Sequence, residues 1–422
     1  MSEPRTLGLF EGFGIEIEYA IVDSATLDVR PIADEALRAA AGGDEWTGDF
    51  EDGPIAWSNE LVRHVLEAKT NGPVPSLEGV AGAFYASMRR VDTILRERFD
   101  AQLVPGAMHP WMDPAFETQL WPHEYSEVYG AFDKIYDCRR HGWANVQSVH
   151  VNLPFKDEEE FARLMAAIRI VLPLVPALAA ASPIVESKAT GRLDSRLEFY
   201  RTNSKRTPAM AGEVIPEPIF DIEGYRERVL GPIQRELKAV DTDGILHGRE
   251  WSNARGAIAR FDRNAIEIRL IDAQERPSAD LAVAAAVSGL VKHLVDGAGA
   301  PLAVQQEVPS APLVKLLARC VDHGPNAPLE DSGLARLFDP KLSRVATTGE
   351  LVAAVVPRCF LGGQDLEPAL EVVLREGTLA QRILSRLGDA KQQSDPRERL
   401  REVWSDLADC LIADRPFHAA RG

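Results

Sequence analysis

Residues 14–23 read Gly14-Ile-Glu-Ile-Glu-Tyr-Ala-Ile-Val-Asp23, and their polarity alternates along the whole segment. Side chains two positions apart lie on the same face of a β-strand. The segment therefore predicts a strand with one face packed on a core, made of Ile15, Ile17, Tyr19 and Ile21. Glu16 and Glu18 then stand side by side on the other face, about 7 Å apart. Two such carboxylates need cations to stay ionised if that face is partly buried, although a solvated strand face carries the same pattern.

Three further segments are predicted to be strands, and helical patterns lie between them. The strands are residues 62–69, 148–153 and 265–271. Apolar residues recur at helical spacing over residues 77–99, and Asp157 with Glu160 predicts the start of another helix through a capping box. Ser278 is expected to cap an alanine-rich helix over residues 279–295, which Gly297 closes. Strands and helices without a regular βαβ rhythm predict an α+β fold with a largely antiparallel sheet.

Composition changes along the second half of the chain. The apolar stretch at residues 170–185 is shorter than a membrane span and contains three prolines, so we expect a buried, kinked helix. Residues 297–312 are rich in Gly, Ala, Pro and Gln, which indicates a boundary. We expect a catalytic domain over residues 8–298 and a loosely attached, mainly helical segment over residues 299–422. Its predicted helices are residues 313–321, 366–375, 379–387 and 397–412.

Overall composition narrows the class of protein. The 422 residues carry a net charge of −17, with 45% hydrophobic and 26% charged residues, as in an ordinary globular protein. The acidic balance argues against a non-specific nucleic-acid binder and against a basic membrane-surface protein. The four cysteines form no CxxC pair, and residues 1–6 contain no apolar segment. We therefore expect a cytoplasmic protein with reduced thiols, without partners in nucleic acid or membrane.

Two of the later predicted strands also carry polar residues on one face. In Ala265-Ile-Glu-Ile-Arg-Leu-Ile-Asp272 the apolar side chains share a face, which leaves Glu267 and Arg269 on the other. In Ser148-Val-His-Val-Asn152 the same alternation places His150 beside Asn152. A carboxylate beside an arginine can be a plain ion pair, and a single strand histidine is often structural. These residues are therefore candidates for a site only in combination.

Arginine is concentrated in a short part of this acidic chain, at Arg249, Arg255, Arg260, Arg263 and Arg269. The guanidinium fork suits the oxygens of phosphate and carboxylate groups. A second basic cluster is equally consistent with an ordinary solvated surface, and it consists of Arg196, Arg201, Lys205 and Arg206.

Several common kinds of site are excluded. The chain has no GxxxxGK[ST] sequence, so it is not a P-loop enzyme. Gly12-Phe-Gly14 lacks a third glycine and leads into a strand, so it is not a dinucleotide fingerprint. Neither HExxH nor GxSxG occurs. The remaining carboxylates, histidine and arginines fit hard metal ions and ATP phosphates better than nucleophilic catalysis.

Taken in order, five short motifs resemble those of the glutamate–cysteine ligase and carboxylate–amine ligase families. They are G-I-E-x-E from Gly14, Leu66-Glu67-Ala-Lys-Thr70-Asn-Gly-Pro73, G-x-x-H-P over Gly106 to Pro110, H-x-N at His150, and Glu267-Ile-Arg269 followed by Asp272-Ala-Gln274. The resemblance covers residues 8–295. It implies a glutamine-synthetase-like catalytic domain, in which a curved antiparallel sheet with flanking helices holds Mg²⁺ between carboxylates and the phosphates of ATP.

The resemblance also implies roles for single residues. One Mg²⁺ would be held by Glu16, His150 and Glu267, and another by Glu18 and Glu67. Arg269 would lie near the transferred phosphate. Arg255 matches the arginine of the family's W-D-x-R-P motif, but Ser252-Asn253 and a few extra residues depart from that motif, so Arg260 competes for the role. The candidate ligand contacts beside these are Arg260, Arg201 and Asn152, the last in an H-x-N pattern similar to that of the proteobacterial glutamate–cysteine ligases.

The implied reaction is the ATP-dependent formation of an amide. The γ-carboxylate of glutamate would attack the γ-phosphate of ATP, and an amine, by family default that of cysteine, would displace phosphate from the acyl phosphate. The expected partners are small amino-acid substrates, with a homo-oligomer as an open alternative. Two other functions stay open: a phosphotransferase of the guanidino-kinase type, for which Cys138 is the only cysteine in the matched region, and a non-catalytic sensor that binds nucleotide or metal.

Overall fold

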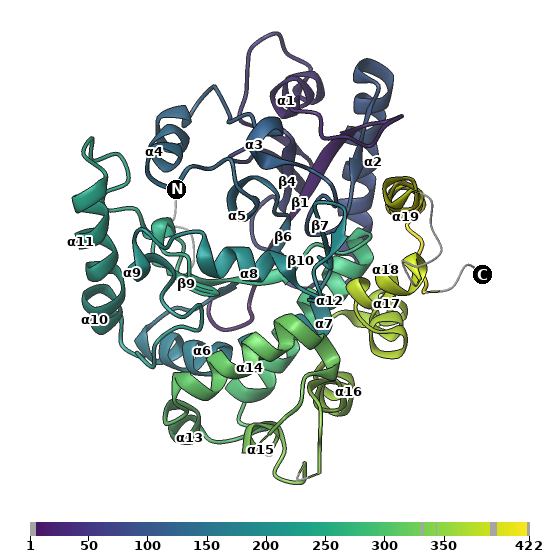
Figure 1. Cartoon of the computed structure of the whole chain (residues 1–422). Helices are drawn as coiled ribbons and strands as arrows, with labels where there is room; N and C mark the ends of the chain where they lie inside the picture. Colours follow the sequence, from purple (N-terminus) through teal and green to yellow (C-terminus); the bar gives the residue numbers. More distant parts are fainter. Residues whose placement is uncertain (1–5, 331–332, 343, 389–394, 420–422) are drawn as a thin grey trace.

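A computed structural model describes residues 6–330, 333–342, 344–388 and 395–419, and an eight-stranded antiparallel sheet lies at its centre (Figure 1). Residues 1–5, part of the predicted polar N-terminus, lie outside the described residues. The strands follow one another across the sheet as β2 (Asp49–Asp52), β3 (Ile55–Asn59), β4 (Val65–Thr70), β1 (Gly14–Asp23), β6 (Ser148–Pro154), β10 (Ala265–Asp272) and β9 (Ala257–Arg260). A further strand, β5 (Ala101–Val104), pairs with the end of β1. The predicted α+β fold with an antiparallel sheet is confirmed.

Strand β1 has the two different faces that its alternation predicts. Ile15 and Ile17 are fully buried in the main hydrophobic core, together with Tyr19 and Ile21. On this side the sheet is covered by α2 (Val80–Phe99), α6 (Glu158–Val171) and α12 (Pro277–Val295), each of which contacts sheet strands, and α12 also contacts the other two helices. The opposite face carries the acidic side chains of β1. The shorter helices include α1 (Ala33–Ala41), α4 (Ser126–Tyr136), α5 (His141–Ala144), α8 (Ser195–Thr202) and α11 (Gly231–Val240).

The most apolar helices belong to this core. As expected from its prolines, the stretch after residue 170 is buried and irregular: α6 passes through a 3₁₀ turn (Leu172–Leu174) into α7 (Val175–Ala179). This helical run and α12 are both long and apolar enough to cross a membrane. However, 89% and 83% of their apolar windows are buried inside the molecule, which is typical of core helices in soluble proteins. A cytoplasmic location stays a prediction.

The start of α12 differs from our prediction. The helix begins at Pro277, and Arg276 occupies the N-cap position that we assigned to Ser278. Proline is favoured at the first helical position because its missing N–H has no partner there in any case. Ser278 lies in the first turn instead, and its hydroxyl donates to the carboxylate of Asp414 at 3.0 Å.

The C-terminal segment is mainly helical, as predicted, and it surrounds the lower and right-hand sides of the molecule in Figure 1. Its helices are α13 (Leu302–Gln306), α14 (Ser310–His323), α15 (Gly333–Phe338), α16 (Thr348–Cys359), α17 (Gly363–Glu376), α18 (Leu379–Leu387) and α19 (Pro396–Ala413). Side chains of α14 to α17 belong to the same buried cluster as the sheet. A second cluster joins Ala20 and Val22 of β1 to Ile383 of α18 and Trp404 of α19. The loose attachment that we expected is therefore wrong, whereas the domain boundary at residue 298 stays a prediction.

A buried ion pair also ties this segment to the catalytic half of the chain. Arg382 of α18 contacts Glu275, at 2.7 Å between Nη1 and Oε1 and 3.2 Å between Nη2 and Oε2. The two side chains are 0% and 2% exposed. Burial alone would raise the pKa of Glu275, but the charge and hydrogen bonds of Arg382 lower it overall. Glu275 is therefore ionised, and in the core its charge is compensated by that of Arg382.

Replacing Arg382 by Ala should destabilise the fold, because Glu275 is left as an unpaired charge in the core. Breaking such a pair typically costs about 3–5 kcal/mol. We expect a loss of this size in the free energy of unfolding, measured by urea titration followed by circular dichroism. Arg375→Ala is the control, since Arg375 pairs with Glu371 on the surface, and its unfolding midpoint should not move. Equal midpoints for both variants would contradict the prediction.

Candidate active site

The polar face of the sheet collects acidic and basic residues that are distant in the sequence. Because β4, β1, β6 and β10 are neighbours, their registers place these residues opposite one another. The pairs are Glu16 with Lys69 and His150, Glu18 with Glu67, and Glu267 with Asn152. All five predicted metal ligands line one cavity of about 750 Å³, which we call the trough.

His150 and Glu16 form the first half of this arrangement. The Nδ1 atom of His150 lies 2.9 Å from Glu16 Oε2, and its Nε2 atom lies 3.0 Å from Ser148 Oγ. Asn152 donates from Nδ2 to the other oxygen of Glu16 at 3.1 Å. Burial alone would raise the pKa of Glu16, but the hydrogen bond and charge of His150, helped by nearby cations, lower it to about 2. Glu16 is therefore ionised at neutral pH.

A crowded group of carboxylates lies beside this pair. Oxygens of Glu18, Glu60 and Glu67 come within 4.8 Å of one another, and ligand atoms of Glu16, Glu67 and His150 do the same. Burial, followed by the charges of Glu67 and Glu18, raises the pKa of Glu60 well above its usual range. Burial and the charge of Glu16 likewise raise the pKa of Glu67. Glu67 belongs to both groups, so the two could hold neighbouring cations.

Glu267 differs from the other predicted ligands because two arginines hold it. Arg269 Nε lies 3.0 Å from Glu267 Oε1, and Arg260 donates from Nη1 to Glu267 Oε2 at 3.0 Å. The Nδ1 atom of His150 is 3.9 Å from the same carboxylate. Burial alone would lower the pKa of Arg269, but Tyr200 and the surrounding carboxylates raise it, so the guanidinium stays charged.

The other two predicted arginines lie away from this arrangement. Arg255 is buried and donates from Nε to Glu217 at 2.7 Å, and it also donates to the carbonyl of Ala209. Arg201 is exposed and pairs with Glu198. Neither arginine lines the trough or the second cavity that adjoins it, which is described below. Arg255 and Arg260 were the two candidates for the arginine of the W-D-x-R-P motif. Only Arg260 of these two reaches the trough, because it ends strand β9 (Ala257–Arg260), whereas Arg255 precedes that strand.

Some motif residues have structural contacts instead. Asp272 accepts hydrogen bonds from the buried Arg196 and from the backbone of Ala181. His109, in the G-x-x-H-P motif, is 2% exposed, and its Nε2 atom contacts the carbonyl of Leu27 at 2.8 Å. Burial lowers the pKa of His109 to about 4. Asp272 and His109 position the strands and loops around the site and line neither cavity.

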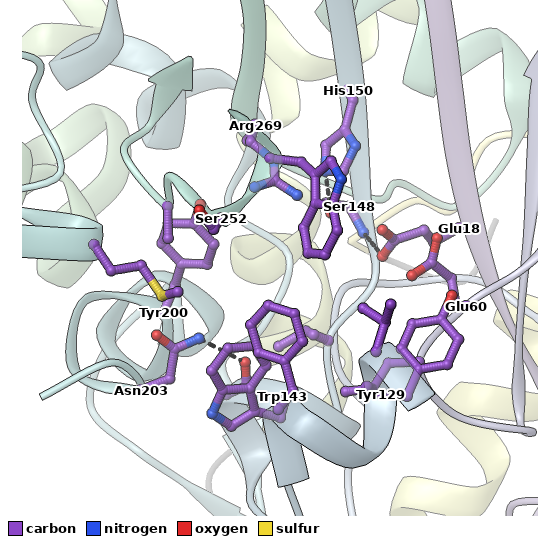
Figure 2. Close-up of a pocket in the computed structure, with 18 of the residues that line it drawn as sticks. Glu18, Glu60, Tyr129, Trp143, Ser148, His150, Tyr200, Asn203, Ser252 and Arg269 are labelled. Atoms are coloured by element: carbon purple, nitrogen blue, oxygen red, sulfur yellow. Dashed lines mark hydrogen bonds between the residues drawn. The ribbon is translucent and has the colours of Figure 1, made fainter. Parts of the chain in front are cut away.

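A second cavity of about 460 Å³ adjoins the trough, and we call it the aromatic pocket (Figure 2). The two cavities share lining residues, namely Glu18, Glu60, His150, Trp251 and Arg269. Figure 2 shows Glu18 and Glu60 on one side of the pocket and Tyr200 with Asn203 on the other. Glu60 and the aromatic lining were not predicted from the sequence. Apart from Trp251, which begins the stretch that resembles W-D-x-R-P, they lie on loops and helices that carry no recognisable motif.

Comparison with known proteins agrees with this geometry. Residues 12–403 match the model of glutamate-cysteine ligase family 2 (GCS2). An uncharacterized protein of Archaeoglobus fulgidus is 30% identical to this chain, over 94% of the chain and 98% of that protein. A protein of Rubrobacter xylanophilus with the provisional name glutamate–cysteine ligase 2-3 is 29% identical, over 44% of this chain. That match spans 47% of the Rubrobacter protein, about half its length.

Two solved structures share the fold. A glutamate–cysteine ligase from Francisella tularensis, solved with AMP, superposes with a TM-score of 0.58 at 12% identity, over 97% of this chain and 90% of that one. A bifunctional glutathione synthetase from Pasteurella multocida gives a TM-score of 0.55 at 14% identity, over 96% of this chain and 53% of that one. Fold and family match define the class of ATP-dependent carboxylate–amine ligases. Within that class, the chain belongs to glutamate-cysteine ligase family 2.

Proposed function

We propose that this enzyme joins the γ-carboxylate of glutamate to an amine, with Mg²⁺ and ATP, through an acyl phosphate. The observation that carries the proposal is the junction of the two cavities. The trough offers carboxylates and arginines for a metal–nucleotide complex, and the aromatic pocket opens from it at Arg269. Cysteine is the amine that the name of the family implies.

The donor set fits Mg²⁺. Carboxylate oxygens are the hard ligands that this ion prefers, and a divalent cation would offset the burial and mutual repulsion that raise the pKa of Glu60 and Glu67. The Oδ1 atom of Asn152 is buried without a hydrogen-bond partner among the described residues. Glu16, Glu67 and His150 would hold one ion, with Glu267 beside it, and Glu18, Glu60 and Glu67 would hold another. Bound Mg²⁺ supplies positive charge that neutralises the phosphate oxygens.

The residues of the chain then position the reactants. An oxygen of the substrate carboxylate forms a bond to the γ-phosphorus, and the bond between that phosphorus and ADP breaks. The neutral amine nitrogen next forms a bond to the acyl carbon, the bond between that carbon and the phosphate oxygen breaks, and the nitrogen releases one proton to solvent. Arg269 lines both cavities, so its guanidinium would contact the phosphoryl group during its transfer and stabilise the charge on its oxygens. Arg260 would act as a positioning residue by holding Glu267.

The reaction class can be tested with hydroxylamine in place of the amine. A ligase given Mg-ATP, glutamate and hydroxylamine should form γ-glutamyl hydroxamate and release ADP and phosphate in equal amounts. A stable phosphorylated acceptor without free phosphate would indicate a kinase. Cys138, on which the guanidino-kinase alternative depended, is fully buried and lines neither cavity. Failure with every carboxylate, in protein that still binds Mg-ATP, would leave the non-catalytic alternative.

Arg260→Ala should weaken the binding of Mg-ATP by about 10-fold or more, because groups that orient a metal ligand have effects of this size. Without Arg260, Glu267 loses one of its two guanidinium partners. Isothermal titration calorimetry with a non-hydrolysable ATP analogue and Mg²⁺ measures this directly. Arg201→Ala is the matched control, and its dissociation constant should stay within about twofold of the unmodified enzyme. A larger effect for Arg201 than for Arg260 would reverse our assignment.

A further inference from the structure

We propose that the aromatic pocket binds the amine substrate, and that this amine carries a large apolar or aromatic group. The inference builds on the proposed function, since it names the amine of the same reaction. It replaces cysteine as the preferred amine. Three features of the pocket support it: the chemistry of one wall, the separation of its polar groups, and its size.

One wall of the pocket is apolar and already packed. It is formed by the loop after β3, by α4 and α5, and by the loop between α5 and β6, through Leu61, Val128, Tyr129, Phe132, Trp143 and Val146. The ring of Phe132 packs against that of Trp143, with centroids 5.4 Å apart, and against that of Trp251 at 5.8 Å. These rings hold one another in place, so the wall is preformed. A preformed apolar wall favours a ligand that removes it from water.

The polar groups of the pocket are separated into two sides. In Figure 2, Tyr200, Asn203 and Ser252 lie on one side, and Glu18 and Glu60 lie on the other next to Tyr129. The segment of Ser252 also carries Arg249, an exposed lining residue that forms no ion pair among the described residues. This cation suits the second carboxylate of glutamate. The acid substrate therefore belongs on the side of Tyr200 and Arg249.

The opposite side suits an amine. Because Glu18 and Glu60 are proposed to hold Mg²⁺ together with Glu67, this side of the pocket lies next to the metal and the acyl phosphate, where the attacking amine must arrive. Leu61 directly follows Glu60 in the chain, and Val128 and Tyr129 belong to the same wall. The body of an amine held near these carboxylates therefore lies against apolar side chains. Aromatic rings also attract cations over their faces, which adds to the preference for an amine.

The size of the pocket favours a large amine over cysteine. A cavity of about 150 Å³ is enough to hold benzene. The aromatic pocket has about 460 Å³, which leaves room for a phenyl-sized group beside the glutamyl part. The side chain of cysteine is a single methylene with a thiol, and it would leave most of the apolar wall in water. Phenethylamine is a suitable probe, because it combines a primary amine with one phenyl ring.

The first test compares amines in the ADP-release assay with glutamate and Mg-ATP. We expect kcat/KM for phenethylamine to exceed that for cysteine by about tenfold or more, since apolar groups that fill a pocket discriminate on this scale. Equal or higher kcat/KM for cysteine would overturn the inference and keep the proposed ligase. Turnover with hydroxylamine distinguishes a failure of this inference from a failure of the proposed function. Turnover with hydroxylamine but not with phenethylamine overturns only the inference, and no turnover with any amine or acid overturns the proposed function.

The second test alters the wall. Val128 is half-buried in α4, and Val128→Asp places a charge against the bound phenyl group. We expect the ratio of kcat/KM for phenethylamine to that for hydroxylamine to fall about tenfold or more. Val240→Asp in α11 is the matched control, because Val240 is also half-buried but does not line the pocket, and its ratio should be unchanged. Circular dichroism checks folding, and Leu61→Asn serves if Val128→Asp does not fold. An unchanged ratio in the folded variant would overturn the inference.

Discussion

Glu16→Gln is expected to lower Mg-ATP-dependent turnover by about 100-fold or more while the protein stays folded. Even groups that only support a metal ligand change affinity or activity by 10–100-fold, and Glu16 is proposed to be a ligand itself. The amide keeps the shape of the side chain, so contacts with His150 and Asn152 can persist, but a neutral oxygen binds Mg²⁺ far more weakly. Two measurements check this result: ADP release, and the affinity for Mg²⁺ by calorimetry.

The control for this variant lies on the same sheet. Glu51 belongs to β2, is exposed, and lines neither cavity. Glu51→Gln should therefore have the turnover and Mg²⁺ affinity of the unmodified enzyme. If Glu16→Gln behaved in the same way, Glu16 would be an ordinary solvated carboxylate, and the metal assignment would be wrong.

Arg269→Ala should produce the largest fall in kcat, about 1000-fold. Removing a single group that stabilises charge in the transition state costs about 10²–10³ in kcat, and arginines in phosphoryl transfer can contribute more. The KM for ATP should change much less, because Arg260 and the carboxylates of the trough remain. Arg269→Lys keeps a positive charge but loses the planar fork, so we expect it to recover only a small part of the activity.

Arg263 provides the comparison for Arg269. It also lines the trough and lies 3.6 Å from Glu16, but its side chain is 50% exposed and it does not reach the aromatic pocket. Arg263→Ala should therefore reduce kcat by less than about tenfold. A result in which Arg269→Ala changes only KM would place Arg269 at the bound nucleotide and away from the transferred phosphoryl group.

The long strands of the site could be predicted from the sequence because their periodicity is set by burial. Residues 14–23, 148–153 and 265–271 alternate clearly, and the structure contains strands at these positions to within one residue. Alternation also predicted which side chains share a face, and the registers then bring Glu16, His150 and Glu267 into one trough. The short strands β2, β3, β5 and β9 were not predicted, since four or five residues are too few to show a period.

Contacts between distant segments could not be predicted in this way. Glu60 follows a short strand in a loop, and only the packing of α4 and α5 beside it creates the aromatic pocket. The helix containing Trp404 was predicted from its apolar pattern, but that pattern does not tell which surface the helix covers. Similarly, the spacing around Arg255 and Arg260 fitted either residue, and the choice depends on where strand β9 begins.

The contact between β1 and α19 has a consequence for how the protein is made. Strand β1 is synthesised long before α18 and α19, yet Ala20 and Val22 are buried in one cluster with side chains of these two helices. The central strand thus stays partly uncovered until α18 and α19 have been synthesised, and its contacts join segments that are far apart in the sequence. Folding that depends on such distant contacts is slow and exposes apolar surface to other chains. We therefore expect the enzyme to complete its fold only after α19 has left the ribosome, with soluble yield that rises at lower growth temperature or with chaperone co-expression.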